Sequence, residues 1–184
     1  MTRIVGGLAR GRRLVVPRQG TRPTSDRARE ALFNTLAGLI DLDGARVLDV
    51  FAGTGAVGLE ALSRGAGHVT LVESDRTAAA ALRRNLAAVA LPGAVLVQCP
   101  VESFLAGDAQ APFRLVYADP PYAFEDDALA GLLGRLAAPG WLEARAIVVV
   151  ERSARSPGPG WPAVIEPIRQ KRYGEGVLWY GRRQ

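Results

Sequence analysis

The residues best placed for chemistry form the motif Asp119-Pro120-Pro121-Tyr122, which follows an apolar run at 113–118. Two consecutive prolines supply no amide hydrogen and fix φ, so a strand over the apolar run must end there. The Asp119 carboxylate and the Pro120 carbonyl can accept the two hydrogens of an exocyclic amine, which favours a pyramidal nitrogen and spreads developing positive charge. Tyr122 offers a ring on which a base can stack. The motif predicts amine methylation on a nucleic-acid base, with Asp119, Pro120 and Tyr122 as catalytic residues.

A second stretch, at 47–61, combines an apolar run, the carboxylate of Asp49 and a G-x-G-x-x-G pattern at 53–58. This order is typical of a strand, a tight turn and a helix start that bind a nucleotide-like cofactor. Three interpretations fit the glycines: a turn without ligand, a dinucleotide site and a site for S-adenosylmethionine. Asp49 would repel a pyrophosphate and attract the ammonium group of S-adenosylmethionine, so it favours the third. Glu73 is expected to end the next strand, where its side chain can accept both ribose hydroxyls.

Charge is distributed unevenly along the 184 residues. Residues 1–30 carry eight arginines against two acids, and 152–184 carry seven basic residues against two acids, for net charges of +6 and +5; the net charge of 31–151 is −6. Basic ends around an acidic centre indicate a polyanion binder. Genome composition could also enrich arginine, but it would not segregate the charge. The candidate phosphate contacts, each of which could instead be a solvated surface arginine, are Arg10, Arg12, Arg13, Arg22, Arg27 and Arg29.

Cys99, His68 and Lys171 are each the only residue of their type. A single cysteine excludes an internal disulfide, and one cysteine with one histidine argues against a zinc site or a Ser-His-Asp triad. A Schiff-base mechanism would depend on Lys171 alone. No apolar run approaches the about 20 residues that span a bilayer, and the N-terminus lacks the apolar region of a signal peptide. We therefore expect a cytoplasmic monomer with no metal site and no membrane partner.

Hydrophobic content of 48% suits one domain with a substantial core. Weak alternation with glycine breaks over 2–16 predicts a basic β-hairpin, so we expect an N-terminal extension at 1–23 and a catalytic domain at 24–184. A helix is expected from N-cap residues at 24–26 to about residue 37, and further helices at 58–63, 76–89, 101–105 and 126–136. Strands are expected at 46–50, 69–73, 95–98, 113–118, 146–150, 163–168 and 176–180.

This alternation predicts an α/β fold with a doubly wound, Rossmann-like sheet that is mainly parallel and has its last strand antiparallel. Pro167, inside the penultimate strand, favours an edge position for that strand. Ligands of such a sheet bind beyond the carboxyl ends of the strands, where Asp49, Glu73, Val101 and Asp119 all fall. Candidates from separate parts of the chain therefore converge on one site.

The two motifs, with Gly6-Gly7…Gly11-Arg12-Arg13, the stretch at 22–34 and Lys171-Arg172-Tyr173-Gly174, resemble the RsmD-type methyltransferases. These enzymes methylate guanine N2 in small-subunit ribosomal RNA, and the resemblance covers nearly the whole chain. It implies the class I methyltransferase fold, S-adenosylmethionine as cofactor and ribosomal RNA or the small ribosomal subunit as partner. The chain departs from this family after the third expected strand, where relatives often carry Asp-Ala and this chain has Pro100-Val101, followed by Glu102. Glu102 or the main chain would then accept the hydrogen bond from the adenine amine.

The resemblance also implies roles for individual residues, and we combine these with the candidates above. The predicted cofactor contacts are Asp49, Phe51, Ala52, Gly53, Thr54, Gly55, Glu73, Ser74, Val101, Glu102 and Asp119. The predicted substrate contacts are Pro121, Tyr122, Arg10, Arg12, Arg13, Arg22 and Arg27.

The expected reaction is methyl transfer to the exocyclic N2 amine of a guanine in 16S ribosomal RNA, within the assembled subunit or an assembly intermediate. Two alternatives stay open. DNA adenine or cytosine amino-methyltransferases share the Asp-Pro-Pro-Tyr motif, but they usually need a target-recognition region for which this chain has no spare segment. The other alternative is a non-catalytic RNA-binding or assembly protein with the same fold, against which the intact Asp49, Glu73 and Asp119 argue.

Overall fold

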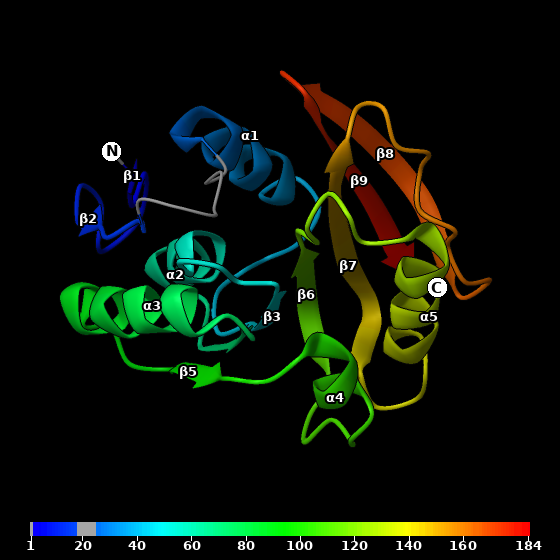
Figure 1. Cartoon of the computed structure of the whole chain (residues 1–184), viewed down its shortest axis with the longest axis horizontal. Coiled ribbons are helices and arrows are strands. Elements are labelled where there is room, and N and C mark those ends of the chain that lie inside the picture. Colours follow the sequence, from blue (N-terminus) through cyan, green and yellow to red (C-terminus); the bar gives the residue numbers. More distant parts are fainter. Residues whose placement is uncertain (1, 18–24) are drawn as a thin grey trace.

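The computed structural model describes residues 2–17 and 25–184. At its centre is a seven-stranded sheet with the strand order β5-β4-β3-β6-β7-β9-β8 (Figure 1). Its strands are β3 (Arg46–Val50), β4 (His68–Val72), β5 (Ala94–Val97), β6 (Phe113–Ala118), β7 (Leu142–Ser153), β8 (Ile165–Tyr173) and β9 (Gly176–Arg183). The helices are α1 (Asp26–Leu36), α2 (Ala56–Ser63), α3 (Arg76–Val89), α4 (Val101–Leu105) and α5 (Asp126–Leu136).

The strands from β3 to β7 are parallel, and β9 lies antiparallel between β7 and β8. Successive strand residues point to opposite faces, so Leu115 of β6 packs into one core cluster and Val116 into the other. Helices α1, α2 and α3 contribute to the first cluster, and α4 and α5 to the second (Figure 1). The prediction of a doubly wound, mainly parallel sheet is confirmed, and both of its faces are covered as a parallel sheet requires.

Local capping signals set the helix starts. Ser25 accepts the Ala28 N–H at 3.1 Å before α1, and Asp75 accepts the Ala78 N–H at 2.8 Å before α3. The predicted bounds of α3, α4 and α5 are confirmed, whereas α2 begins at Ala56, two residues earlier than expected. The N-cap of α1, Ser25, lies within the predicted capping residues at 24–26. Arg22 and the boundary between 1–23 and 24–184 lie outside the described residues.

The largest differences from the predicted strands are in the last part of the sheet. β8 continues to Tyr173, well beyond the predicted end at residue 168, because it pairs with β9 along this length although most of its side chains are exposed. No hydrophobic alternation could reveal such an edge strand. Pro167 lies at the register shift of this pairing, on the edge strand, as predicted. β7 begins at Leu142 rather than at 146, and Arg145, with φ of 62°, interrupts its pattern.

The predicted N-terminal hairpin is present as a two-stranded antiparallel sheet of β1 (Thr2–Arg3) and β2 (Arg13–Leu14). Ile4 and Leu14, which are 0% and 6% exposed, belong to the core cluster that contains α2 and α3. The side-chain amide of Asn85, a buried residue of α3, accepts the Val15 N–H at 2.7 Å and donates to the carbonyls of Val15 at 3.0 Å and Thr54 at 2.9 Å. The hairpin is therefore packed onto the helical layer and joined to the glycine-rich turn.

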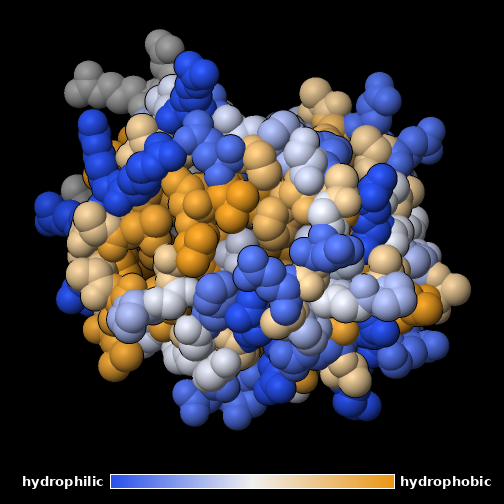
Figure 2. All heavy atoms as spheres, turned by 90° about the horizontal axis from the view of Figure 1, so that it is seen from below, coloured by the Kyte–Doolittle hydropathy of each residue, from blue (hydrophilic) through white to orange (hydrophobic). Residues whose placement is uncertain are grey.

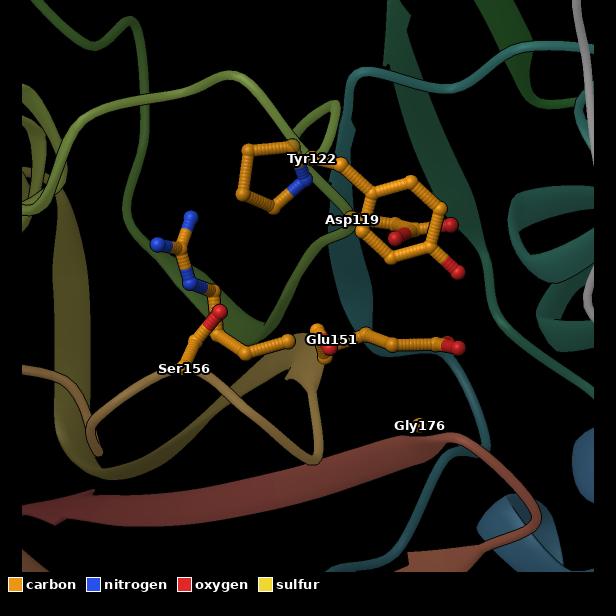
Figure 3. A pocket seen from close by; sticks show the side chains of 8 residues that line it. Asp119, Tyr122, Glu151, Ser156 and Gly176 are labelled. Carbon is orange, nitrogen blue, oxygen red and sulfur yellow. The ribbon is translucent and has the colours of Figure 1, made fainter.

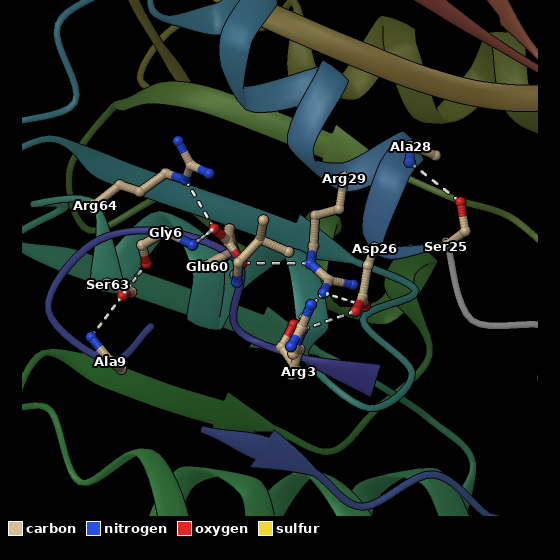
Figure 4. A network of polar contacts seen from close by, with 12 residues as sticks. Arg3, Gly6, Ala9, Ser25, Asp26, Ala28, Arg29, Glu60, Ser63 and Arg64 are labelled. Carbon is tan, nitrogen blue, oxygen red and sulfur yellow. Dashed lines mark hydrogen bonds and ion pairs between the residues drawn. The ribbon is translucent and has the colours of Figure 1, made fainter. Parts of the chain in front are cut away.

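A buried carboxylate on α2 also holds the hairpin (Figure 4). Glu60 is 0% exposed and accepts the backbone N–H groups of Val5 and Gly6, each at 2.7 Å. Its oxygens also pair with Arg64 at 2.8 Å and with Arg29 of α1 at 3.4 Å. Arg29 is itself 0% exposed, so the prediction that it contributes to phosphate docking is wrong. Its guanidinium instead joins α1, α2 and the hairpin in one ionic network.

β5 forms one edge of the sheet and is only partly covered, with Val95 47% exposed. Figure 2, the view from below in which β5 and α4 lie nearest, shows a central hydrophobic area bordered by hydrophilic side chains. The strand has four residues, so this edge presents few unpaired backbone groups. Within 2–17 and 25–184, no helix has the length and apolar character to cross a bilayer.

Candidate active site

A cleft runs along the edge of the sheet where the parallel strands end. Its walls come from the turn after β3, the residues after β4, the Asp-Pro-Pro-Tyr turn after β6, the end of β7, the β8–β9 turn and α1. The predicted site residues that line it are Asp49, Phe51, Ala52, Gly53, Thr54, Glu73, Ser74, Asp119, Pro120, Pro121, Tyr122 and Arg27. The fold thus brings the two sequence motifs together in one cavity.

Glu73 connects the two turns at the cofactor end of the cleft. One of its carboxylate oxygens accepts the Gly53 N–H at 2.7 Å, and the other accepts the Asp75 N–H at 2.7 Å. Asp49, only 2% exposed, accepts the Gly58 N–H at 2.8 Å from the first turn of α2. Both carboxylates are therefore held in fixed positions by backbone donors and face the same cavity.

Two glycines of the turn have different physical roles. Gly53 has φ of 56°, and a Cβ placed on it would meet no atom within 4 Å, so this part of the turn is open. Gly55 has φ of 77°, and a Cβ there would lie 2.1 Å from the Leu82 side chain. Gly55 therefore allows α2 and α3 to pack closely, whereas Gly53 exposes its backbone to a ligand.

Three of the predicted cofactor contacts, Gly55, Val101 and Glu102, do not line the cleft as the structure describes it. Val101 is 3% exposed and packs in the second core cluster, and Glu102 is exposed on the first turn of α4. The predicted cofactor contacts of Gly55, Val101 and Glu102 remain predictions.

The cleft is electrostatically suited to cations. Burial, opposed by the Gly58 hydrogen bond and reinforced by the charge of Glu73, raises the pKa of Asp49 to about 7. Burial, then the charges of Glu151 and Asp49, raises the pKa of Asp119 well above its ordinary value of 3.8. A bound cation would favour ionisation of these converging carboxyl groups, whereas a bound pyrophosphate would oppose it, so the cleft fits the ammonium and sulfonium charges of S-adenosylmethionine better than a dinucleotide. No cluster of potential metal ligands occurs in the part of the chain that the structure describes.

The Asp-Pro-Pro-Tyr turn closes the opposite end of the cleft (Figure 3). β6 ends at Ala118, as the prolines predict, and Tyr122 is 69% exposed above the cavity. Phe124, just after the turn, packs edge-on against Phe51 of the glycine-rich turn, with ring centroids 5.1 Å apart. The two motifs thus support each other directly.

Sequence reasoning missed Glu151, the tenth residue of β7, which lines the cleft beside Asp119. Its carboxylate accepts the Tyr117 hydroxyl at 2.5 Å. A usable signal was present, because Glu151 follows the apolar run at 146–150 as Asp119 follows the run at 113–118. The rule that located Asp119 and Glu73 at strand ends would have located Glu151 as well.

The predicted basic contacts lie in several environments. Arg10 and Arg13 are exposed on the hairpin, and Arg27 lines the cleft from α1. Arg12 is exposed, but it donates to the carbonyls of Ala88, at 3.0 Å, and Val89 at the end of α3. Across the cleft, Arg172 of β8 joins the lining. Arginines from both basic ends of the chain therefore flank one opening.

Comparisons with known proteins now bear on this site. The chain matches the family described as "Conserved hypothetical protein 95" over residues 2–182. It belongs to this family. The "Ribosomal RNA small subunit methyltransferase D" of Escherichia coli K12 is 44% identical over 174 residues, which are 94% of this chain and 85% of the relative. The "Putative rRNA methyltransferase YlbH" of Bacillus subtilis is 33% identical over 98% of this chain and 99% of its own length.

A solved structure titled "Putative methyltransferase yhhF from Escherichia coli" superposes with a TM-score of 0.88 at 39% identity, covering 100% of this chain and 98% of that one. The resemblance to RsmD-type methyltransferases is confirmed, and so is the predicted fold class.

Proposed function

We propose that this protein transfers a methyl group from S-adenosylmethionine to the exocyclic N2 amine of a guanine in small-subunit ribosomal RNA. The observation that carries the proposal is the convergence of Asp49, Glu73 and the Asp119–Tyr122 turn in one cleft. The names of the relatives, which include a ribosomal RNA small subunit methyltransferase, support RNA as the substrate class.

At the cofactor end, Asp49 would hold the ammonium group and Glu73 the ribose hydroxyls, with the backbone of the Phe51–Thr54 turn and Ser74 beside them. S-adenosylmethionine supplies an electrophilic methyl group carried on a sulfonium. Backbone N–H groups of Gly58, Gly53 and Asp75 already hold these two carboxylates in position. The carboxylates can therefore make these contacts without rearrangement.

At the reaction end, the positive sulfonium of the cofactor would favour ionisation of Asp119 despite its raised pKa. The Asp119 carboxylate and the Pro120 carbonyl then accept the hydrogens of the guanine amine. These bonds direct the nitrogen lone pair toward the methyl group and stabilise positive charge that grows only as transfer proceeds. Tyr122, exposed at the rim, stacks on the base. Arg27 and Arg172 provide phosphate contacts at the opening, and Arg10 and Arg13 provide them on the exposed hairpin.

A transfer assay with three substrates tests the proposal. Tritiated methyl groups are supplied with naked ribosomal RNA, small ribosomal subunits or DNA, and the labelled nucleoside is identified chromatographically. We expect N2-methylguanosine from small subunits or their assembly intermediates and no label in DNA. Label in N6-methyladenine of DNA would support the amino-methyltransferase alternative, and no transfer to any substrate would support a non-catalytic assembly role.

A further inference from the structure

Glu151 lies in a small recess beside the reaction end of the cleft. The recess is lined by Asp119, Pro120 and Tyr122, and by Glu151 and Gly176 from the neighbouring strands. In Figure 3 the side chains of Asp119 and Glu151 extend in the same direction, and the Tyr122 ring lies alongside Asp119. A base that stacks on Tyr122 and presents its amine to Asp119 therefore also meets the Glu151 carboxylate.

Neighbouring residues fix the position of this carboxylate. Tyr117, which is 2% exposed, donates its hydroxyl to one Glu151 oxygen at 2.5 Å. A Cβ on Gly176 would lie 3.1 Å from the other oxygen, so the glycine leaves room for it. The next residue, Arg152, also lines the recess, and its guanidinium donates to Asp126 at 2.6 Å and to the Phe124 carbonyl at 3.0 Å. Glu151 is thus held at the recess.

The edge of guanine that carries the N2 amine also carries a second hydrogen-bond donor, which suits a second acceptor beside Asp119 in the recess. In guanine the N1–H donor is adjacent to the N2 amine, whereas N1 of adenine carries no hydrogen and is an acceptor. We propose that Glu151 accepts the N1–H of the target guanine while Asp119 and Pro120 hold its N2 amine, so that Glu151 selects guanine. This assignment rests on the proposed function.

The selection works in two ways. A carboxylate oxygen has several acceptor sites, so Glu151 can receive the guanine N1–H while it keeps the Tyr117 hydroxyl. A base with a bare N1 would instead place its lone pair against a carboxylate oxygen, and the repulsion between the two acceptors would disfavour binding of that base. Sites built around a specific hydrogen bond reject analogues that lack it far more strongly than sites built on shape alone.

The test replaces the target guanine with 2-aminopurine, which retains the N2 amine but has an acceptor at N1. After nucleoside mapping identifies the position, small-subunit RNA carrying either base is assembled into particles and kcat/KM is measured for each. We expect the wild type to prefer guanine by about 100-fold or more. In Glu151→Gln the side-chain amide can donate to a bare N1, so the preference should fall at least about tenfold.

Two further variants separate recognition from folding. Tyr117→Phe keeps the carboxylate but removes its hydrogen bond, and its preference for guanine should fall several-fold. Glu143→Gln is the matched control, because Glu143 also belongs to β7 but pairs with Arg114 outside the cleft. Its preference for guanine over 2-aminopurine should match that of the wild type. Thermal melting of all variants verifies folding, and Tyr117→Phe keeps the inference testable if Glu151→Gln does not fold.

The role of Glu151 and the proposed function can be refuted independently. If the wild type methylates guanine N2 but Glu151→Gln and Tyr117→Phe keep its full preference over 2-aminopurine, Glu151 does not read N1 and only this inference is lost. If the wild type does not methylate guanine N2 in any ribosomal substrate, the proposed function itself is wrong.

Discussion

Binding of S-adenosylmethionine at pH 6 should release protons from Asp49. Burial is the main cause that raises the pKa of this carboxyl group to about 7 in the ligand-free protein. A group with that pKa is about 0.9 protonated at pH 6. The ammonium group of the ligand, with an ordinary α-amino pKa of about 8, is already protonated at pH 6. Since pairing with this cation requires the ionised carboxylate, about 0.9 of a proton should leave per ligand bound.

Calorimetry measures this release. Titrations at pH 6 in two buffers with different ionisation enthalpies give apparent binding enthalpies whose difference counts the protons. Asp49→Asn should bind the cofactor about tenfold or more weakly, because a charged hydrogen bond contributes roughly 1.5–3 kcal/mol, and should lose the release that belongs to this residue. Asp119 also has a raised pKa, so any release that persists in the variant belongs to that second carboxyl.

Tight binding by the wild type at pH 6 without any proton release would refute the reasoning. It would mean that Asp49 is ionised before the ligand arrives or does not face the ammonium group.

Three other predictions concern the reaction, the RNA surface and stability. Asp119→Ala should reduce the single-turnover methylation rate on small subunits by about 10²–10³ while cofactor affinity changes little, because the carboxylate stabilises charge that develops during transfer; a rate equal to the wild type would show that the motif is structural. Replacing Arg10 and Arg13 together by Ala should weaken RNA binding and reduce its log–log salt slope by about 1 per arginine, with cofactor affinity unchanged; binding assays that retain the full slope would move the docking surface elsewhere. Glu60→Ala should lower the free energy of unfolding by about 3–5 kcal/mol, since it leaves the fully buried Arg29 without one of its carboxylate partners; a change in urea denaturation below about 1 kcal/mol would contradict the structural role of the network.

The parts of the fold that the sequence predicted well are those with local physical causes. Asp75 caps α3, the prolines end β6 and the buried runs of β3 and β6 are continuous, so these bounds needed no tertiary information. The parallel sheet then placed Asp49, Glu73 and Asp119 together, because the carboxyl ends of parallel strands meet at one edge.

The features that escaped prediction depend on partners distant in the sequence. β8 is a strand because β9 lies beside it, although its own side chains are mostly exposed. From the sequence, Arg29 is a surface arginine near a helix start. In the structure it is buried because it pairs with Glu60, which is thirty-one residues away in the sequence. Glu151 is the exception, because the apolar run at 146–150 already placed it at a strand end, but no turn motif beside it marks it as part of a site.

The attachment of the hairpin by Asn85, Glu60 and core contacts has a thermodynamic consequence for association with RNA. Arg10 and Arg13 project from a segment whose backbone is already fixed against α2 and α3, so its conformational entropy was lost when the chain folded. The proposed docking surface is therefore preordered and does not have to fold when RNA binds. Because little conformational entropy is lost on binding, more of the attraction between arginines and phosphates contributes to the net affinity. Because Asn85 also donates to the Thr54 carbonyl, one side chain supports both the hairpin and the glycine-rich turn, so RNA docked on the proposed surface would lie at a defined position relative to the proposed cofactor site.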